Sequence, residues 1–469
     1  MSLAPAAAAE RPPTAAPGAP AGGIEGRAAG LRYGALGLPL AFVALPLYVV
    51  LPAHYADQYG VPLALLGAVL LGARLLDAIA DPLIGRWVDR LFERGARAAW
   101  RAAAAAAVLL ALGFRALFFP AVDGTAALLA WCAAGLAVTY LAFSVVTVVH
   151  QAWGARLGGD EPRRARVVAW REGAALVGVL VASVLPSVAG LQWSTAVFAL
   201  LLAAGLGLLA GAPRPPEVAA RKGNEDGLAT PQERGGAAAR SLDQGAEAGL
   251  RQPDDLWLPF GVTAFRRLLA VFMVNGIASA IPATLVLFFI RDRLQAPDWE
   301  PAFLAAYFAA GALSIPLWVR AVGRLGLAPA WLLGMLLNVA AFVGAAALGA
   351  GDTLAYLAVC VASGIGLGAD LTLPGALLAG VIQRAGHAGR REGAYFGWWN
   401  FATKLNLALA AGLALPLLST FGFESGVRDE SALQALTLVY CLLPCALKIT
   451  AAALLWALWL RHPDPGVRP

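Results

Sequence analysis

Two acidic residues lie within a long apolar stretch, at a depth where a membrane helix rarely carries charge. Asp77 and Asp81 are four positions apart, so on a helix they share one face, and Arg74 lies one turn earlier on the same side. Such charges are costly in hydrocarbon unless they face a protein interior or a water-filled cavity, which makes them functional candidates. One arginine cannot neutralise two carboxylates. The pattern therefore predicts that Asp77 and Asp81 bind a transported sodium ion or proton. An ion pair that only holds helices together is the alternative.

Lys404 is the next charge of interest, within the apolar segment GWWNFATKLNLALAAG. A lysine at this depth is expected to face the interior of a helix bundle. We expect Lys404 to approach Asp77 and Asp81 across the interface between two bundles, so that Arg74 and Lys404 form a charge-coupling pair around the two acids. The alternative is a lysine that extends to the membrane surface.

Several polar and aromatic side chains are predicted to line a solute path. His150 and Gln151 end an apolar run and could donate hydrogen bonds or relay a proton, while Arg171 could hold a polar solute. Asp370 lies beside glycines that permit close helix contact. Ordinary interhelical hydrogen bonds and packing explain these residues almost as well. The predicted substrate cavity comprises His150, Gln151, Arg171, Asp370, Trp398 and Asn400.

The motif Gly85-x-x-x-Asp89-Arg90 is predicted to form a cytoplasmic gate. Asp89 can cap or pair with helix ends of the other bundle when the cytoplasmic side is closed. This latch has to break during each transport cycle.

The composition is that of a membrane protein with many spans: 59% of the 469 residues are hydrophobic and 14% are charged. Arginine-rich cytoplasmic loops explain the basic charge better than nucleic acid does, so no nucleic-acid partner is expected. The four cysteines lie in apolar runs without metal-ligand spacing and are interpreted as packing residues. The four dispersed histidines make a membrane-embedded enzyme a remote alternative. We expect no cofactor, and no metal other than a transported sodium ion.

Apolar segments long enough to cross about 30 Å of hydrocarbon fall into two sets of six. The sequence thus predicts an all-α membrane protein with twelve transmembrane helices in two six-helix bundles. The predicted divisions are a disordered cytoplasmic tail (1–30), an N-terminal bundle (31–213), a cytoplasmic linker (214–258), a C-terminal bundle (259–461) and a cytoplasmic tail (462–469).

Arginines follow the second, fourth, eighth and tenth predicted spans, whereas the opposite loops hold only Arg291, Arg293 and Arg428. Positively charged loops stay in the cytoplasm, so both termini are predicted to be cytoplasmic.

The two halves repeat one another around a proline. Asp81-Pro82-Leu83 in the second span corresponds to Ile315-Pro316-Leu317 in the eighth. In this register Asp77 falls opposite Gly311, so the scaffold itself does not require acids at these positions. The repeat favours a functional role for Asp77 and Asp81.

These residues resemble the major facilitator superfamily, and more narrowly the glycoside-pentoside-hexuronide:cation symporter family. The likeness is carried by Tyr33-Gly34, by Arg74-x-x-Asp77-x-x-x-Asp81-Pro82, by the stretch from Arg163 to Arg171, and by Arg391-x-Gly393-x-Tyr395 through Lys404. The resemblance implies the two-bundle major facilitator fold. It also implies that Asp77 and Asp81 are the coupling-cation carboxylates, Lys404 their charged neighbour and Arg171 a cavity or gating residue.

The chain departs from that family at three positions. Ala41 and Ser144 stand where the sugar-transporting members place aspartates that clamp sugar hydroxyls, and Ala80 stands where a sodium-coordinating amide is expected. Proton coupling is therefore as well supported as sodium coupling. Relatives in the broader superfamily carry lysolipids, so a lysolipid or other amphipathic solute is the alternative substrate.

The sequence as a whole predicts a secondary active transporter that couples sodium or proton entry to symport of a small organic solute, such as a glycoside, by alternating access. We expect a monomer in the bacterial inner membrane, in contact with membrane lipids.

Overall fold

The computed structural model describes residues 26–216, 256–420 and 429–461. These residues form helices and short connections, without strands. Most of the predicted tail 1–30, nearly all of the predicted linker 214–258 and the whole of the predicted tail 462–469 lie outside the described residues.

The N-terminal half begins with a span that is broken into short helices. Pro46 lacks a backbone N–H, and a π-helical turn begins at this residue. The second span is the long helix α4, which carries Asp77 and Asp81 and runs without a break through Pro82. The elements of this half are α1 (Arg27–Gly34), α2 (Gly37–Leu45), η1 (Pro46–Val50), α3 (Leu51–Tyr59), α4 (Leu63–Glu93), α5 (Ala96–Phe118), α6 (Thr125–Arg156) and α7 (Glu161–Ala210).

The element α7 contains two membrane spans. Gly190 has φ 80° and ψ 169°, a conformation that glycine adopts easily, and the helix breaks there. The first of these spans begins at Glu161, because the Asp160 side chain accepts a hydrogen bond from the Arg163 N–H (3.0 Å) and caps the helix. The arginines that follow Asp160 are therefore helical residues rather than loop residues.

The C-terminal half repeats the same plan. Pro297 and Trp299 bound a short 3₁₀ turn that leads into α12, and the last span is interrupted by π-helical turns. The elements are α10 (Leu258–Gly261), α11 (Thr263–Phe288), η2 (Phe289–Arg293), η3 (Pro297–Trp299), α12 (Glu300–Leu325), α13 (Leu327–Ala345), α14 (Thr353–Arg384), α15 (Glu392–Thr420), α16 (Glu430–Thr437), η4 (Leu438–Leu442), α17 (Leu443–Leu455) and η5 (Trp456–Leu460).

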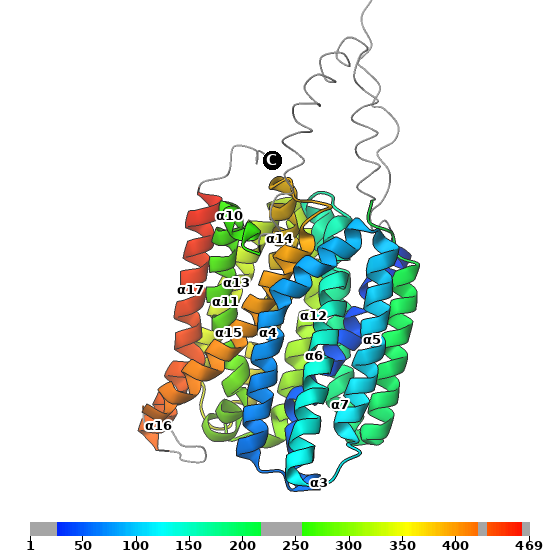
Figure 1. Ribbon diagram of the computed structural model, residues 1–469. Helices are drawn as coiled ribbons and strands as arrows, with labels where there is room; N and C mark the ends of the chain where they lie inside the picture. The colour runs from blue at the N-terminus through cyan, green and yellow to red at the C-terminus, as the bar shows by residue number, and fades with distance from the viewer. Residues whose placement is uncertain (1–25, 217–255, 421–428, 462–469) are drawn as a thin grey trace, which may run out of the picture.

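Eleven helical stretches of the described chain are long and apolar enough to cross a membrane. The element α4 is not among them, but it is 31 residues long and runs alongside the others (Figure 1). Together they make the predicted all-α, twelve-span protein. The protein is a multi-pass membrane protein.

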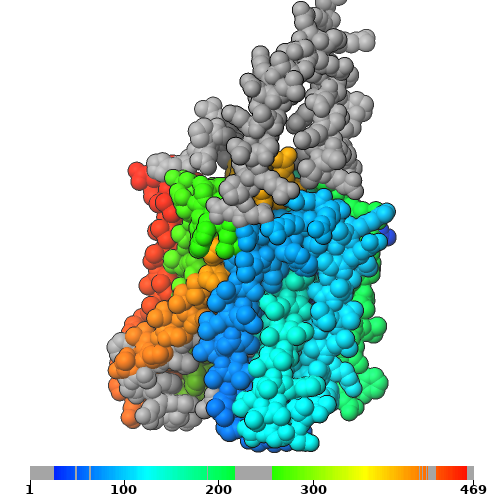
Figure 2. Space-filling view, in the orientation of Figure 1, coloured from blue at the N-terminus to red at the C-terminus, as the bar shows by residue number. Residues whose placement is uncertain are grey.

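The two halves form bundles that lie side by side (Figure 1). One hydrophobic core fills the N-terminal bundle, and two further clusters fill most of the C-terminal bundle. The bundles meet where α15 crosses α4 and where α7 packs against α12 and α14. Figure 2 shows α15 in orange running next to α4 in blue across this face. The chemistry of interest lies at the α4–α15 crossing.

Candidate cation and solute site

A lysine from one bundle contacts two acids of the other. Lys404, on α15, places its Nζ 2.7 Å from Asp77 Oδ2 and 2.7 Å from Asp81 Oδ2, both on α4. Asp77 and Asp81 point the same way because they are one helical turn apart. A single ammonium group therefore faces two carboxylates, and these three side chains together carry one net negative charge when both acids are ionised.

Ser144 completes this cluster from a third helix, α6. Its hydroxyl donates to Asp77 Oδ1 at 2.7 Å, and Lys404 Nζ donates to Ser144 Oγ at 2.9 Å. Ser144 thus fixes the orientation of both neighbours. The sequence singled out Ser144 only as a position where the resembled family has an aspartate. A serine in an apolar helix gives no signal that it contacts charged side chains of two other helices.

Burial differs sharply across the cluster. Asp81 is 0% exposed, whereas the Lys404 side chain is 22% exposed. Neither oxygen of Asp81 receives a hydrogen bond of standard geometry from the described residues. The negative charge of Asp81 is therefore balanced by the nearby ammonium group of Lys404. A buried carboxylate with unused acceptor positions can take up a proton or contact a small cation. Of the three charged side chains, that of Lys404 is the most exposed.

Arg74 occupies a different environment from its neighbours on α4. It is exposed, while Asp77 and Asp81 are buried. Lys404 is the cation whose contacts with both acids the structure shows.

A second set of polar contacts joins the bundles at the predicted cytoplasmic end. Asp89 accepts hydrogen bonds from the N–H groups of Gly393 (2.7 Å) and Ala394 (2.8 Å), so its charge caps the N-terminus of α15. Arg156 on α6 lies 2.9 Å from Asp89 Oδ1 and 3.1 Å from Glu392 Oε2. The three charged side chains are buried. These contacts hold the predicted cytoplasmic side closed; Arg90, also predicted for this gate, is exposed at the next position.

Two other contacts close the same end. Glu161, at the start of α7, accepts a hydrogen bond from the Leu327 N–H (2.8 Å), and Arg164 donates to Gln383 Oε1 at 2.7 Å. Both join the N-terminal bundle to the C-terminal one.

The close approach of α4 and α15 depends on glycine. A Cβ atom added at Gly85 would clash with the backbone oxygen of Gly393, and one added at Gly397 would clash with the backbone of Asp81. Backbone atoms cannot move aside as a flexible side chain can.

Gly85→Ala is expected to force α4 and α15 apart and disfavour closure of this end. Overpacking of this kind costs about 1–3 kcal/mol, so we expect solute uptake to slow about tenfold. The midpoint of thermal unfolding should change little. The matched control is Gly72→Ala on the same helix, where an added Cβ meets no atom within 4 Å. Equal uptake by the two variants in proteoliposomes would show that the contact at Gly85 is irrelevant to the cycle.

Two of the predicted solute residues meet across the bundles. Asn400 Nδ2 donates to Gln151 Oε1 at 3.0 Å, which joins α15 to α6. Gln151 and Arg171 also line a cavity of about 10 Å³, room for about one water molecule. Arg171 pairs with its neighbour Glu172 at 2.7 Å. A solute could bind here only after the bundles separate.

His150 and Trp398 lie elsewhere. His150 is fully buried between α6 and α1, where its Nε2 lies 2.8 Å from the Tyr33 carbonyl oxygen and the Tyr33 hydroxyl donates to the His150 carbonyl oxygen at 3.1 Å. The Trp398 indole donates to the Leu256 carbonyl oxygen (2.8 Å) and packs on Trp257. Neither side chain lines the small cavity at Gln151.

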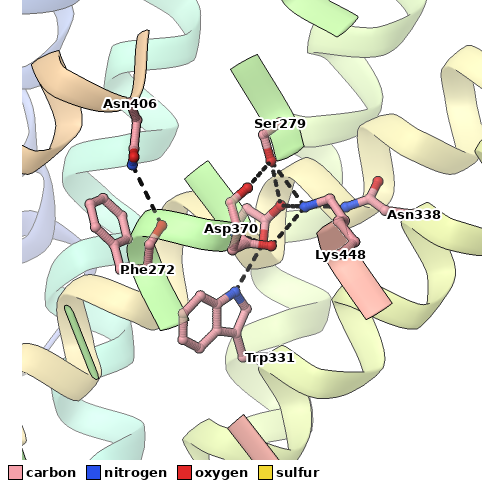
Figure 3. Close-up of polar contacts among 8 residues, drawn as sticks. Phe272, Ser279, Trp331, Asn338, Asp370, Asn406 and Lys448 are labelled. Carbon is pink, nitrogen blue, oxygen red and sulfur yellow. Dashed lines mark hydrogen bonds and ion pairs between the residues drawn. The ribbon is translucent and has the colours of Figure 1, made fainter. Parts of the chain in front are cut away.

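Asp370 belongs to a separate network inside the C-terminal bundle, shown in Figure 3. Lys448 Nζ lies 2.6 Å from Asp370 Oδ2, and Trp331 Nε1 donates to Asp370 Oδ1 at 2.9 Å. Asp370 also lines a cavity, but the residues that line this cavity all belong to the C-terminal bundle. Lys448 was not predicted as a functional residue. A lysine within the last apolar span could nevertheless have been recognised from the sequence as a candidate.

The fold and the site define the class of protein. Two six-helix bundles, with a cluster of charged side chains at their contact and one end closed by buried ion pairs, form the architecture of a secondary transporter. The family described as MFS/sugar transport protein matches residues 32–213 and 247–461, and the chain belongs to this family. The match confirms the predicted membership of the major facilitator superfamily and fits the glycoside-pentoside-hexuronide:cation symporter family. The protein is therefore a transporter of small-molecule solutes and not an enzyme.

Solved structures show the same fold at low sequence identity. A bacterial homologue of the iron transporter ferroportin in the outward-facing state is 16% identical, with a TM-score of 0.64 over 91% of this chain and 100% of that chain. The E. coli fucose:proton symporter FucP is 12% identical, with a TM-score of 0.58 over 90% and 97%. The proton:xylose symporter XylE, bound to 6-bromo-6-deoxy-D-glucose, is 14% identical, with a TM-score of 0.58 over 92% and 94%. No curated protein matches the sequence significantly.

Proposed function

We propose that this protein is a symporter that couples the entry of a proton or sodium ion to the uptake of a small organic solute, a sugar or glycoside. The family description supports a sugar as the solute. Two proteins with the same fold are described as proton symporters of fucose and xylose, which makes the proton a natural first candidate for the ion. The proposed location is the bacterial inner membrane, with both termini in the cytoplasm.

The observation that carries this proposal is the position of Lys404. Its ammonium group comes from the C-terminal bundle, and the two acids that it contacts come from the N-terminal bundle. Any cation that binds Asp77 and Asp81 therefore competes with a contact that holds the bundles together. Ion binding and bundle movement are linked because the ion has different affinities for the two arrangements.

The proposed cycle follows from this competition. With the predicted cytoplasmic end closed by Asp89, Arg156 and Glu392, a cation enters from the opposite side and binds Asp77 and Asp81. Lys404 is released, the solute binds between the bundles, and the two halves rock about the site. Opening of the closed end then releases solute and cation into the cytoplasm.

One observation favours a second substrate class. The hydroxyl of Ser144 is engaged by Asp77 and Lys404, and Ala41 supplies no acid, so neither position offers a free carboxylate to clamp sugar hydroxyls. A lysolipid or other amphipathic solute is the alternative that this arrangement leaves open.

Transport by the purified protein in proteoliposomes tests the proposal. Radiolabelled monosaccharides, glycosides and a lysophospholipid are offered separately under an inward proton gradient, an inward sodium gradient or no gradient. We expect one of the water-soluble solutes to accumulate above its external concentration under one gradient only. Accumulation of the lysophospholipid alone would select the second class, and equilibration of every solute regardless of gradient would contradict symport.

A further inference from the structure

The C-terminal bundle contains a cavity of about 170 Å³ that the proposed cycle does not use. The residues around it come from α11, α12, α13, α14, η4 and α17, so it is separate from the cluster of Asp77, Asp81 and Lys404. Ala283, which lines the cavity, is exposed and lies at its rim. A cavity of about 150 Å³ is large enough for a benzene molecule.

Aromatic side chains form part of the wall of this cavity. Six aromatic side chains line it, and the hydroxyls of two of them, Tyr356 and Tyr440, lie 2.6 Å apart, so that one donates a hydrogen bond to the other. Aromatic walls favour an aromatic ring through edge and face contacts. The six are Phe303, Tyr307, Phe308, Phe342, Tyr356 and Tyr440.

One end of the cavity is polar and contains the ion pair of Asp370 and Lys448. These two side chains have little capacity left to form hydrogen bonds with a ligand. Lys448 donates to Asp370 Oδ2 (2.6 Å), Asn275 Oδ1 (2.9 Å) and Ser279 Oγ (3.0 Å), which uses its three N–H donors. Figure 3 shows Lys448, Ser279 and Trp331 converging on Asp370.

Asp370 is saturated in the same way. Its Oδ1 accepts from Asn275 Nδ2 (3.1 Å) and Trp331 Nε1 (2.9 Å), and its Oδ2 accepts from Lys448, with Ser279 and Asn338 at 3.4 Å. A charged ligand would have to break this network or be buried without a counter-ion, both of which are costly. A neutral polar group needs only one hydrogen bond, which Asn338 or Tyr307 on the cavity wall can supply.

We propose that this cavity is a second binding site, for a small neutral amphiphile that consists of one aromatic ring and one hydroxyl or amide group. The ring occupies the space between the aromatic side chains, and the polar group lies toward Asn338 and the Asp370–Lys448 pair. The site is independent of the proposed symport, because it lies within a single bundle and shares no residue with the cation cluster.

Fluorine NMR with 4-fluorobenzyl alcohol and the purified full-length protein tests the proposal. We expect saturable line broadening, and at least about tenfold weaker binding of 4-fluorobenzoate and 4-fluorobenzylamine, which carry the same ring with a charge. Binding should also slow the modification of Cys445, which lines the cavity, by N-ethylmaleimide, as followed by peptide mass spectrometry. Modification of Cys132 in the N-terminal bundle should not change.

A cavity-filling substitution provides the matched comparison. Ser363 lines the cavity, and among the described residues its hydroxyl bonds only to carbonyl groups of its own helix. Ser363→Leu should therefore fill space without leaving another side chain unpaired, and it should weaken binding at least about tenfold. Val361→Leu, at an exposed position two residues earlier, should leave binding unchanged. Non-saturable broadening, equal binding of the charged analogues, or protection of Cys445 that Ser363→Leu does not reduce would each overturn the proposal. None of these outcomes depends on transport activity.

Discussion

Replacing Asp81 by asparagine should abolish uphill accumulation of the solute and leave downhill exchange in place. Asparagine keeps the volume of the buried side chain, and Lys404 keeps its contacts with Asp77 and Ser144, so the bundles still meet. The site then holds one negative charge, which Lys404 already neutralises. No electrostatic reason remains for a second cation to bind.

The expected size of this effect follows from coupling energies. Coupling between two sites is typically about 1–3 kcal/mol, or about 5- to 150-fold in affinity, and this factor should be lost. The accumulation ratio in proteoliposomes under the driving gradient should therefore fall to that seen without a gradient, while solute counterflow continues. Asp123→Asn, which neutralises an exposed acid between α5 and α6, is the control and should accumulate solute normally. Undiminished accumulation by Asp81→Asn would refute the assignment of Asp81 to the coupling site.

The helices of this protein could be predicted from its sequence because hydropathy and length constrain a membrane span strongly. The unusual charges of α4 could be recognised for the same reason, because a membrane span is otherwise apolar. Asp77 and Asp81 stand out in an apolar run, and their four-residue spacing is enough to place them on one face.

The partners of these acids were harder to predict, because they come from other helices. Ser144 is 67 residues from Asp77, and nothing in its local sequence distinguishes it from serines that bond to their own helix. Arg156 looks like an ordinary loop arginine of the charge bias that orients membrane proteins. In the structure it is buried between Asp89 and Glu392, because α6 extends further than its apolar segment.

For the residues predicted to line the substrate cavity, the sequence did not predict which space each side chain faces. Sequence can show that Asp370, His150 and Trp398 are polar or aromatic at membrane depth, but not which interior each one faces. Asp370 faces a cavity within one bundle, His150 joins two helices of the same bundle, and Trp398 packs where the chain enters the C-terminal bundle. These three environments can be distinguished only from the way the helices pack in the bundles.

Lys404→Met should have the second large effect, which is to tighten cation binding while it abolishes coupled transport. Without the ammonium group, Asp77 and Asp81 repel one another across one helical turn, and a cation from solution relieves that repulsion. A gain of about 1.4 kcal/mol corresponds to tenfold, and loss of a competitor 2.7 Å from both carboxylates should give at least that. The contact that links the ion to the other bundle is lost as well, so accumulation stops. A lysine that only supported the fold would have the opposite effect on affinity, because its removal would disorder the site.

The most direct test is equilibrium cation binding to the purified full-length protein and to Lys404→Met. Sodium binding is measured with radioactive sodium, and proton uptake with a pH indicator, at matched thermal stability. Arg101→Met, which removes an exposed cation from α5, is the control. We predict that Lys404→Met binds the coupling cation at least about tenfold more tightly than the native protein, and that Arg101→Met matches the native protein. Unchanged or weaker binding by a folded Lys404→Met variant would contradict competition between Lys404 and the cation for Asp77 and Asp81.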